Sequence, residues 1–125
     1  MTASERPSTA LYGLVPCAGV GQRAGAGMPK QYARIAGRSM VAHTLAALAQ
    51  VGRLTATLVV LSPDDTMFEG AAPGFAGARQ WTKRCGGATR ARSVANGLRE
   101  LRARGAGDDD WVLVHDAARC LLKPE

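Results

Sequence analysis

The stretch "ALYGLVPCAGVGQRAGAGMPKQY", residues 10–32, decides the fold. Its first seven residues form an apolar run that does not alternate with polar residues, which predicts a short strand buried on both faces. A loop with four glycines follows, and it ends in the sequence Pro-Lys-Gln-Tyr. In open parallel sheets, ligands bind just beyond the carboxyl ends of the strands. The stretch therefore predicts a strand with a ligand-binding loop at its end.

Short apolar runs and amphipathic segments alternate along the rest of the chain. We expect four strands, at residues 10–16, 56–61, 78–83 and 111–116, the third weaker than the others and the fourth buried. We expect two helices, at residues 39–50 and 90–105, and a loop over residues 70–77. This order predicts an α/β protein with a doubly wound, mostly parallel sheet.

The sequence also predicts where the first helix begins and ends and which residues of the second helix face inward. Ser39 is placed to cap the first helix, and Gly52 to stop it. In the second helix, the apolar spacing predicts that Val94, Leu98 and Leu101 face inward. Three features then follow the ends of parallel strands: the glycine loop, "SPDD" at 62–65 and "HDAAR" at 115–119. We expect them to lie along one edge of the sheet.

Composition sets the class of protein. The chain has 125 residues, 46% of them hydrophobic, which predicts about one domain with a real core. Residues 1–9 are expected to be a flexible tail, and residues 10–125 to form the domain. The net charge is +6, and no acidic residue occurs between Glu5 and Asp64, which favours an anionic partner. No apolar run is long enough for a transmembrane helix, so we expect no membrane partner.

The cysteines and histidines indicate neither a disulfide framework nor a metal-binding motif. The three cysteines are widely separated, odd in number and without a Cys-x-x-Cys pair. The two histidines do not complete metal-ligand spacing. This pattern predicts a reduced, cytoplasmic protein.

Two common nucleotide motifs fit the glycine loop poorly. Residues 19–24 satisfy Gly-x-Gly-x-x-Ala, but Pro29 and two further glycines would break the helix that a dinucleotide fold requires, and no acid follows before Asp64. The Walker pattern fails because Pro29 precedes Lys30 and Gln31 follows it. What remains is a loop of free backbone amides beside Arg23 and Lys30, which favours phosphate binding.

The loop "PCAGVGQRAGAGMPKQY" resembles the signature loop of nucleotidyltransferases that join a nucleoside triphosphate to a phosphorylated sugar or polyol. With "GGATRARSVANGL" at 86–98 and "VLVHDAAR" at 112–119, it resembles the 2-C-methyl-D-erythritol 4-phosphate cytidylyltransferases of the non-mevalonate isoprenoid pathway. The resemblance implies a Rossmann-like nucleotidyltransferase fold. It also implies a reaction in which the phosphate of methylerythritol phosphate attacks the α-phosphorus of CTP and Mg-pyrophosphate leaves.

The resemblance also implies roles for individual residues. Arg23 and Lys30 would be catalytic, stabilising charge on the α-phosphate. Asp116, the one carboxylate at a strand end beside the phosphate loop, would face Mg²⁺ or the acceptor's hydroxyls, and Arg119 would meet the substrate phosphate. The residues expected to border the nucleotide are Cys17, Ala18, Gly19, Val20, Gly21, Gly86, Gly87, Arg90, Ser93 and Ala117. Ser93 has a second interpretation, as a cap near the start of its helix.

Three residues depart from the family's pattern. Cys17 stands where alanine is usual, Cys120 where proline commonly follows, and Ala88 where an acid is often found. The resemblance implies a protein nearly twice as long as this chain. We therefore expect the sequence to be the nucleotide-binding half of a truncated domain. Alone it is expected to be inactive, with its fourth strand near an exposed edge, and full-length protein is expected to form a homodimer.

Two other functions stay open at this point. A related enzyme could use another polyol phosphate, such as ribitol phosphate, as its acceptor. The basic balance also admits a non-catalytic nucleic-acid binder. That second function is disfavoured, because the few aromatic residues are not grouped for stacking on bases and both tryptophans fall in expected strands.

Overall fold

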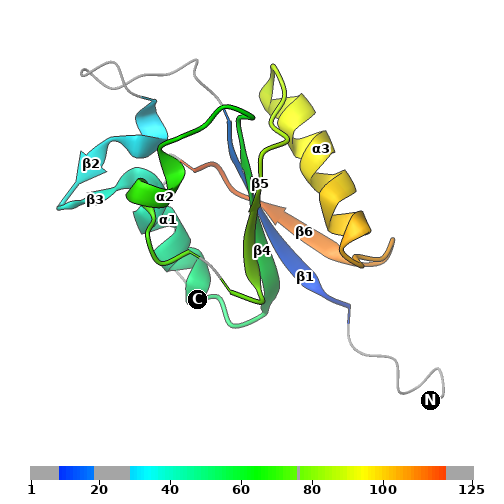
Figure 1. Cartoon of the computed structure of the whole chain (residues 1–125). Helices are drawn as coiled ribbons and strands as arrows, with labels where there is room; N and C mark the ends of the chain where they lie inside the picture. The colour runs from blue at the N-terminus through cyan, green and yellow to red at the C-terminus, as the bar shows by residue number, and fades with distance from the viewer. Residues whose placement is uncertain (1–8, 19–28, 76, 118–125) are drawn as a thin grey trace.

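The structure, a computed structural model, describes residues 9–18, 29–75 and 77–117. Its main sheet has the strand order β5-β4-β1-β6, and all three strand pairs are parallel. The strands are β1 (Leu11–Cys17), β4 (Leu54–Leu61), β5 (Gln80–Lys83) and β6 (Trp111–Val114). All four expected strands are present, and the parallel sheet is confirmed (Figure 1).

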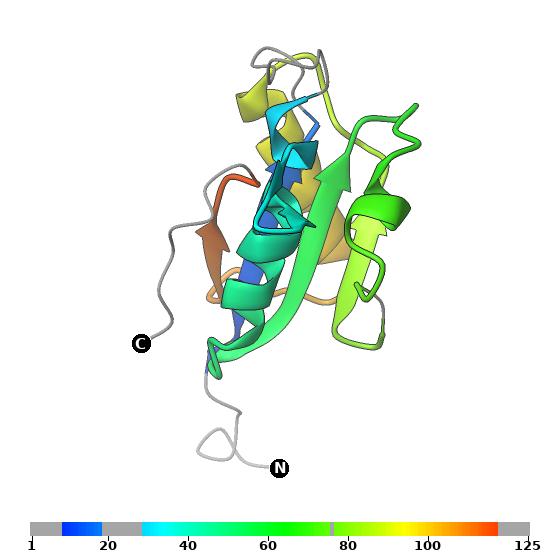
Figure 2. The same ribbon diagram turned by 90° about the vertical axis from the view of Figure 1, so that its left-hand side faces the viewer.

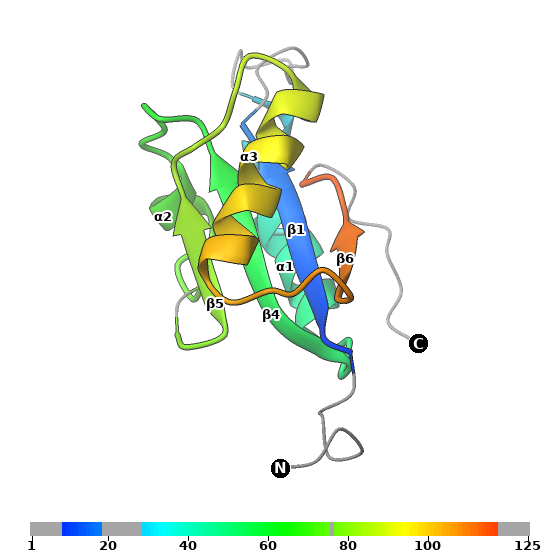
Figure 3. The same cartoon turned by 90° about the vertical axis from the view of Figure 1, so that its right-hand side faces the viewer.

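Helices cover both faces of this sheet, as a doubly wound fold requires. Helices α1 (Met40–Ala49) and α2 (Phe68–Ala71) lie on one face, and α3 (Arg90–Ala103) lies on the other (Figures 2 and 3). Strands β1 and β4 are buried between them because their apolar side chains point to both layers. Within the described ranges, no helix has the length and apolar character needed to cross a membrane.

Helix α1 matches its prediction closely. The Ser39 side chain accepts a hydrogen bond from the Ala42 amide, so Ser39 is the N-cap. Val41, Thr44, Leu45 and Leu48 recur at helical spacing along one face of α1, and all four are buried. These residues join the core on the α1 side of the sheet, which buries branched side chains of β1 and β4.

Helix α3 departs from its expected inward face at one residue, because Leu101 is buried and Val94 packs against the same core. Its buried residues are Ser93, Gly97 and Leu101, whereas Leu98 is 39% exposed, so the inward placement of Leu98 was wrong. A Cβ at Gly97 would lie 2.6 Å from a Leu14 methyl group. The helix backbone therefore lies directly against the sheet at Gly97, and this close contact turns Leu98 toward solvent.

Strand β6 lies at one end of the described sheet, next to β1. The expectation that it lies near an exposed edge is confirmed. The expectation that it is buried was wrong, because Trp111 is 70% exposed and Leu113 is 38% exposed. Side chains on one face of this strand have no helix over them among the described residues, which explains the exposure.

Two small elements were not expected from the sequence. Strands β2 (Arg34–Ile35) and β3 (Arg38–Ser39) form an antiparallel hairpin, with positive φ angles at Ala36 (53°) and Gly37 (83°). A two-residue turn with both φ angles positive suits the twist of a hairpin, but alanine in it gives no sequence signal. Helix α2 begins before and runs into the stretch expected as a loop, because the Asp65 side chain accepts hydrogen bonds from the Met67 and Phe68 amides.

Candidate functional site

The carboxyl ends of β1 and β4 are tied together at one edge of the sheet. The Ser62 hydroxyl, just after β4, donates to the Ala18 carbonyl at 2.7 Å. The Gly86 amide donates to the Leu61 carbonyl at 2.8 Å, which brings in the segment between β5 and α3. The expectation that the start of the glycine loop and "SPDD" share an edge is therefore confirmed.

The segment after β6 reaches the same edge. The Thr44 hydroxyl of α1 donates to the Ala117 carbonyl at 3.0 Å, and Ala117 is 3% exposed. The His115 amide donates to the Leu14 carbonyl, which continues the pairing with β1 past the end of β6. Asp116 therefore follows the end of a strand next to β1, as the sequence predicts.

Gly86 and Gly87 lie where a side chain would not fit. A Cβ at Gly86 would lie 2.3 Å from the Ala18 Cβ, and one at Gly87 would lie 2.1 Å from the Arg92 Cγ. The buried Ser93 hydroxyl accepts a hydrogen bond from the Gly87 amide at 3.0 Å, while Thr89 caps α3. Ser93 thus holds the glycine segment against α3, and its contact with a nucleotide stays a prediction.

The Pro-Lys-Gln-Tyr sequence forms a single 3₁₀ turn, η2 (Lys30–Tyr32). Lys30 is exposed, whereas Gln31 and Tyr32 are buried. The Gln31 side-chain amide donates to the Cys17 carbonyl at 3.3 Å, and the Tyr32 hydroxyl donates to Asp65 Oδ2 at 2.5 Å. We call Gln31 and Tyr32, with their partners Cys17 and Asp65, the clasp.

The sequence analysis missed the clasp, although it singled out the Pro-Lys-Gln-Tyr setting of Lys30. The signal was present in the two polar residues that directly follow the lysine. Burial of Gln31 and Tyr32 requires hydrogen-bond partners, and the nearest strand ends supply them. The partner Asp65 lies 33 residues away from Tyr32, a pairing that local patterns do not reveal.

Two ionisable groups of the clasp are kept neutral. Burial raises the pKa of the Cys17 thiol to about 12. Burial also raises the pKa of the Tyr32 hydroxyl above its ordinary range, and the neighbouring Cys17 and Asp65 add to the shift. Both groups therefore keep their protons at neutral pH, and the Cys17 thiol can donate to the Tyr32 oxygen at 3.7 Å. Cys17 is accordingly a poor nucleophile here.

Arg90 and Asp116, predicted from different motifs, are brought into contact. The Arg90 Nε donates to Asp116 Oδ1 at 2.7 Å, and the Asp116 side chain is 33% exposed. Among the described residues, no group of three or more His, Cys, Asp or Glu side chains could hold a metal ion. Asp116 therefore fits a divalent cation only if phosphate oxygens or water complete the shell, which is the way Mg²⁺ is usually bound.

Five of the predicted site residues lie outside the described residues: Gly19, Val20, Gly21, Arg23 and Arg119. The other nine are described, and they lie at or next to the carboxyl edge of the sheet: Cys17, Ala18, Lys30, Gly86, Gly87, Arg90, Ser93, Asp116 and Ala117. The structure thus brings together the described members of three separate motifs. Their roles toward a ligand stay predictions.

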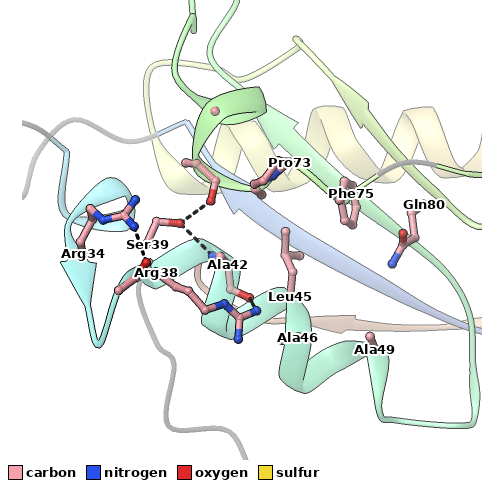
Figure 4. Close-up of a pocket in the computed structure, with 15 residues that line it drawn as sticks. Arg34, Arg38, Ser39, Ala42, Leu45, Ala46, Ala49, Pro73, Phe75 and Gln80 are labelled. Carbon is pink, nitrogen blue, oxygen red and sulfur yellow. Dashed lines mark hydrogen bonds between the residues drawn. The ribbon is translucent and has the colours of Figure 1, made fainter.

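A pocket of about 480 Å³ lies elsewhere, between α1, the β2–β3 hairpin and the segment that follows α2 (Figure 4). None of the predicted site residues lines it. The Arg34 guanidinium donates to the Gly37 carbonyl, and the Arg38 guanidinium donates to the Ala42 carbonyl at 3.5 Å. The Ser39 hydroxyl donates to the Ala71 carbonyl at 2.8 Å. These three polar side chains thus bond to backbone carbonyls of residues that also line the pocket.

Comparison with known proteins points to a single family. A family model described as 2-C-methyl-D-erythritol 4-phosphate cytidylyltransferase matches residues 11–125. The protein of that name from Burkholderia multivorans is 54% identical over 115 residues, which are 92% of this chain and 48% of that protein. The bifunctional enzyme IspD/IspF of Albidiferax ferrireducens is 56% identical over 114 residues, 91% of this chain and 27% of that protein. The chain thus spans about half the length, or less, of these relatives.

Solved structures agree with this match. A crystal structure of 4-diphosphocytidyl-2C-methyl-D-erythritol synthase is similar with a TM-score of 0.77 and 34% identity, over 93% of this chain and 50% of that one. The Francisella tularensis 2-C-methyl-D-erythritol 4-phosphate cytidylyltransferase is similar with a TM-score of 0.69 and 27% identity, over 92% and 47%. The parallel sheet with helices on both faces is therefore the fold of these proteins.

Proposed function

Because this chain belongs to the 2-C-methyl-D-erythritol 4-phosphate cytidylyltransferase family, we propose that it forms the nucleotide-binding part of such an enzyme. The enzyme would transfer CMP from CTP to 2-C-methyl-D-erythritol 4-phosphate and release pyrophosphate. The observation that carries the proposal is the convergence of Lys30, the Gly86–Gly87 segment and the Arg90–Asp116 pair at one edge of a parallel sheet. Ligands of such sheets bind at this edge.

The reaction would depend on positioning and charge. A phosphate oxygen of the acceptor attacks the α-phosphorus of CTP, and the bond to pyrophosphate breaks. Lys30, with Arg23, would stabilise the negative charge that gathers on the α-phosphate oxygens. Lys30 is suited to this role because its side chain is exposed while the two residues after it are buried and hydrogen-bonded. Such a reaction requires little covalent chemistry from the protein.

The nucleoside would lie over the glycine segment. Gly86 packs against Ala18 and Leu61, so the absence of a side chain lets this segment lie directly against the ends of β1 and β4. Ser93 would act by holding the Gly87 amide in place. Arg90 and Ala117 are near neighbours in this arrangement, because Arg90 pairs with Asp116.

Asp116 would hold Mg²⁺ together with oxygens of the triphosphate. A bound cation would neutralise charge on the leaving pyrophosphate. The Arg90 guanidinium fixes the Asp116 carboxylate from one side, at 2.7 Å. Arg119 would meet the acceptor's phosphate. We further propose that the protein is cytoplasmic and, at full length, a homodimer, as the cysteine pattern and the family resemblance imply.

Nucleotide binding tests this function without requiring turnover. We expect the 125-residue chain to bind CTP more tightly than UTP, ATP or NAD, with an affinity that falls when Mg²⁺ is removed. Lys30→Ala should weaken CTP binding, whereas Lys83→Ala should not, because Lys83 pairs with Glu100 on α3 instead. Equal binding of all four nucleotides, or failure to bind any of them, would contradict the proposal. Salt-sensitive binding of DNA in place of CTP would indicate a nucleic-acid binder.

A further inference from the structure

Lys30 must be held at a fixed place to serve a phosphate, yet it lies at the far end of the glycine loop from β1. We propose that Gln31, Tyr32 and Asp65 are positioning residues, which hold the Lys30 ammonium in place for the triphosphate of the nucleotide. This inference rests on the proposed function, because it assumes that Lys30 contacts phosphate. It adds three residues to the site that neither the sequence motifs nor the family match assigns.

The clasp joins the exit of the glycine loop to its entry. Gln31 follows Lys30, and its side-chain amide donates to the carbonyl of Cys17, the last residue of β1, at 3.3 Å. The bond spans 14 residues of sequence. It fixes where the chain returns after the loop, whatever path residues 19–28 take. Holding the turn of residues 29–33 against the end of β1 lowers the entropy cost of placing Lys30 for a bound nucleotide.

Tyr32 anchors the same turn to the segment between β4 and α2. Its hydroxyl donates to Asp65 Oδ2, and the side chain is only 4% exposed. Asp65 is itself held in place, because its Oδ1 accepts from the Met67 and Phe68 amides at 2.8 and 3.0 Å. The two carboxylate oxygens thus serve two elements, the start of α2 and the turn that carries Lys30.

Displacement of Tyr32 would be passed directly to Lys30. The Tyr32 amide donates to the Pro29 carbonyl at 3.0 Å, and the Ala33 amide donates to the Lys30 carbonyl at 3.1 Å. These bonds make residues 29–33 one short, rigid turn. Tyr32 is buried and keeps its proton, so it does not exchange protons with a substrate. We expect its effect on a ligand to act through the turn that carries Lys30.

A double-mutant cycle on nucleotide affinity separates positioning from a general structural role. Tyr32→Phe removes only the hydroxyl, and Tyr12→Phe is the matched control because no carboxylate among the described residues bonds to the Tyr12 side chain. We expect Tyr32→Phe to weaken CTP binding about three- to tenfold, the usual worth of one hydrogen bond, and to leave cytidine binding unchanged. In a Lys30→Ala background, the same change should cause no further loss.

Limited proteolysis measures how firmly the turn of residues 29–33 is held, and it requires no nucleotide. Trypsin cleaves after Lys30, and the bond to Gln31 lies in the anchored turn, so we expect slow cleavage there. Relative to cleavage after Arg53, it should become about tenfold faster in Tyr32→Phe and in Gln31→Met, which keeps the side chain's length without its amide. Gln31→Met also serves as the second variant if Tyr32→Phe does not fold.

The outcomes are distinct. If wild-type protein does not bind CTP, the proposed function fails, and the phosphate role of the clasp fails with it. If CTP binds and the Tyr32→Phe loss adds fully to that of Lys30→Ala, or appears equally for cytidine, the clasp does not act through Lys30. Unchanged cleavage after Lys30 in both clasp variants would show that the clasp does not hold this turn.

Discussion

The carboxyl edge of the sheet and the pocket beside α1 differ in what their polar groups do. At the edge, side chains from distant segments are brought into contact, as with Arg90 and Asp116 or Tyr32 and Asp65. In the pocket, Arg34, Arg38 and Ser39 bond to nearby backbone carbonyls. The pocket offers a volume of about 480 Å³, but the edge offers convergent charge. Cavity size alone would therefore favour the pocket, whereas the convergence of charged groups favours the edge.

This contrast has a physical basis. Parallel strands end together, so segments far apart in sequence meet at the carboxyl edge with their backbone amides and polar side chains. The pocket is lined by residues from 34–49 and 70–80, and its two arginines bond to carbonyls three and four residues away, so their charges do not meet those of distant segments. Substitutions in the two regions should accordingly have unequal consequences.

The largest difference is expected for cationic residues. In a CTP-dependent transfer assay of the complete enzyme, Lys30→Ala should reduce turnover at least on the order of a hundredfold, as for loss of one preorganised donor to a developing charge. Lys30→Arg should not restore it, because a forked guanidinium does not replace a compact ammonium in a tight site. Arg38→Ala in the pocket should leave kcat near that of wild type. Near-normal turnover of the Lys30→Ala variant would contradict the claim that the carboxyl edge, and not the pocket, serves the reaction.

Asp116→Asn should reduce turnover less than Lys30→Ala, by about tenfold or more, as expected for losing one interaction with a charged group. CTP should still bind, with a weaker dependence on Mg²⁺. Because Arg90 and Asp116 are both partly exposed, the free energy of unfolding should change by less than about 1 kcal/mol. A titration that shows loss of CTP binding by folded Asp116→Asn protein would place this carboxylate in the nucleotide site instead.

Two glycines test how tightly each region is packed. Gly86→Ala places a Cβ 2.3 Å from the Ala18 Cβ and 2.9 Å from the Leu61 carbonyl oxygen, so we expect a loss of about 1–3 kcal/mol in the free energy of unfolding. Gly74→Ala, in the pocket lining, meets nothing within 4 Å and should stay within about 0.5 kcal/mol of wild type. Urea denaturation measures both. Equal stability of the two variants would mean that the edge is not closely packed.

Thiol labelling at Cys17 tests the packing beneath the clasp. Burial raises its pKa to about 12, so at pH 8 the thiolate is scarce in the folded protein. Labelling of Cys17 should be more than about a hundredfold slower than in the urea-unfolded chain, and it should accelerate only as pH approaches 12. Peptide mapping after alkylation gives the rate at this residue. Rapid labelling at pH 8 would show that the core beneath the clasp is open to solvent.

Much of the scaffold could be predicted because its signals are local. The β1 and β4 strands are unbroken apolar runs, and α1 has both a serine cap and an apolar face. The inward placement of Leu98 was wrong, and the pattern of apolar residues could not have revealed this. Contact of Gly97 with the sheet sets how α3 is rotated, and a glycine carries no hydrophobic signal.

The site was predictable in its motifs but not in its supports. The alternation of strands and helices, with the rule for parallel sheets, was enough to place the start of the glycine loop and Asp116 at one edge. The Arg90–Asp116 pair and the Tyr32–Asp65 bond join residues 26 and 33 positions apart, and no local pattern links them. Such pairs depend on how the strand ends are brought together, which only the folded chain defines.

The location of bound CTP tests the account most directly. We would record backbone amide chemical shifts of the labelled 125-residue chain while adding CTP with Mg²⁺. The account predicts that the largest changes occur at Ala18, Lys30, Gly86 and Gly87, and that amides around the pocket, such as those of Ala46 and Gly74, hardly move. Changes concentrated at Ala46 and Gly74, with the carboxyl edge unaffected, would contradict it.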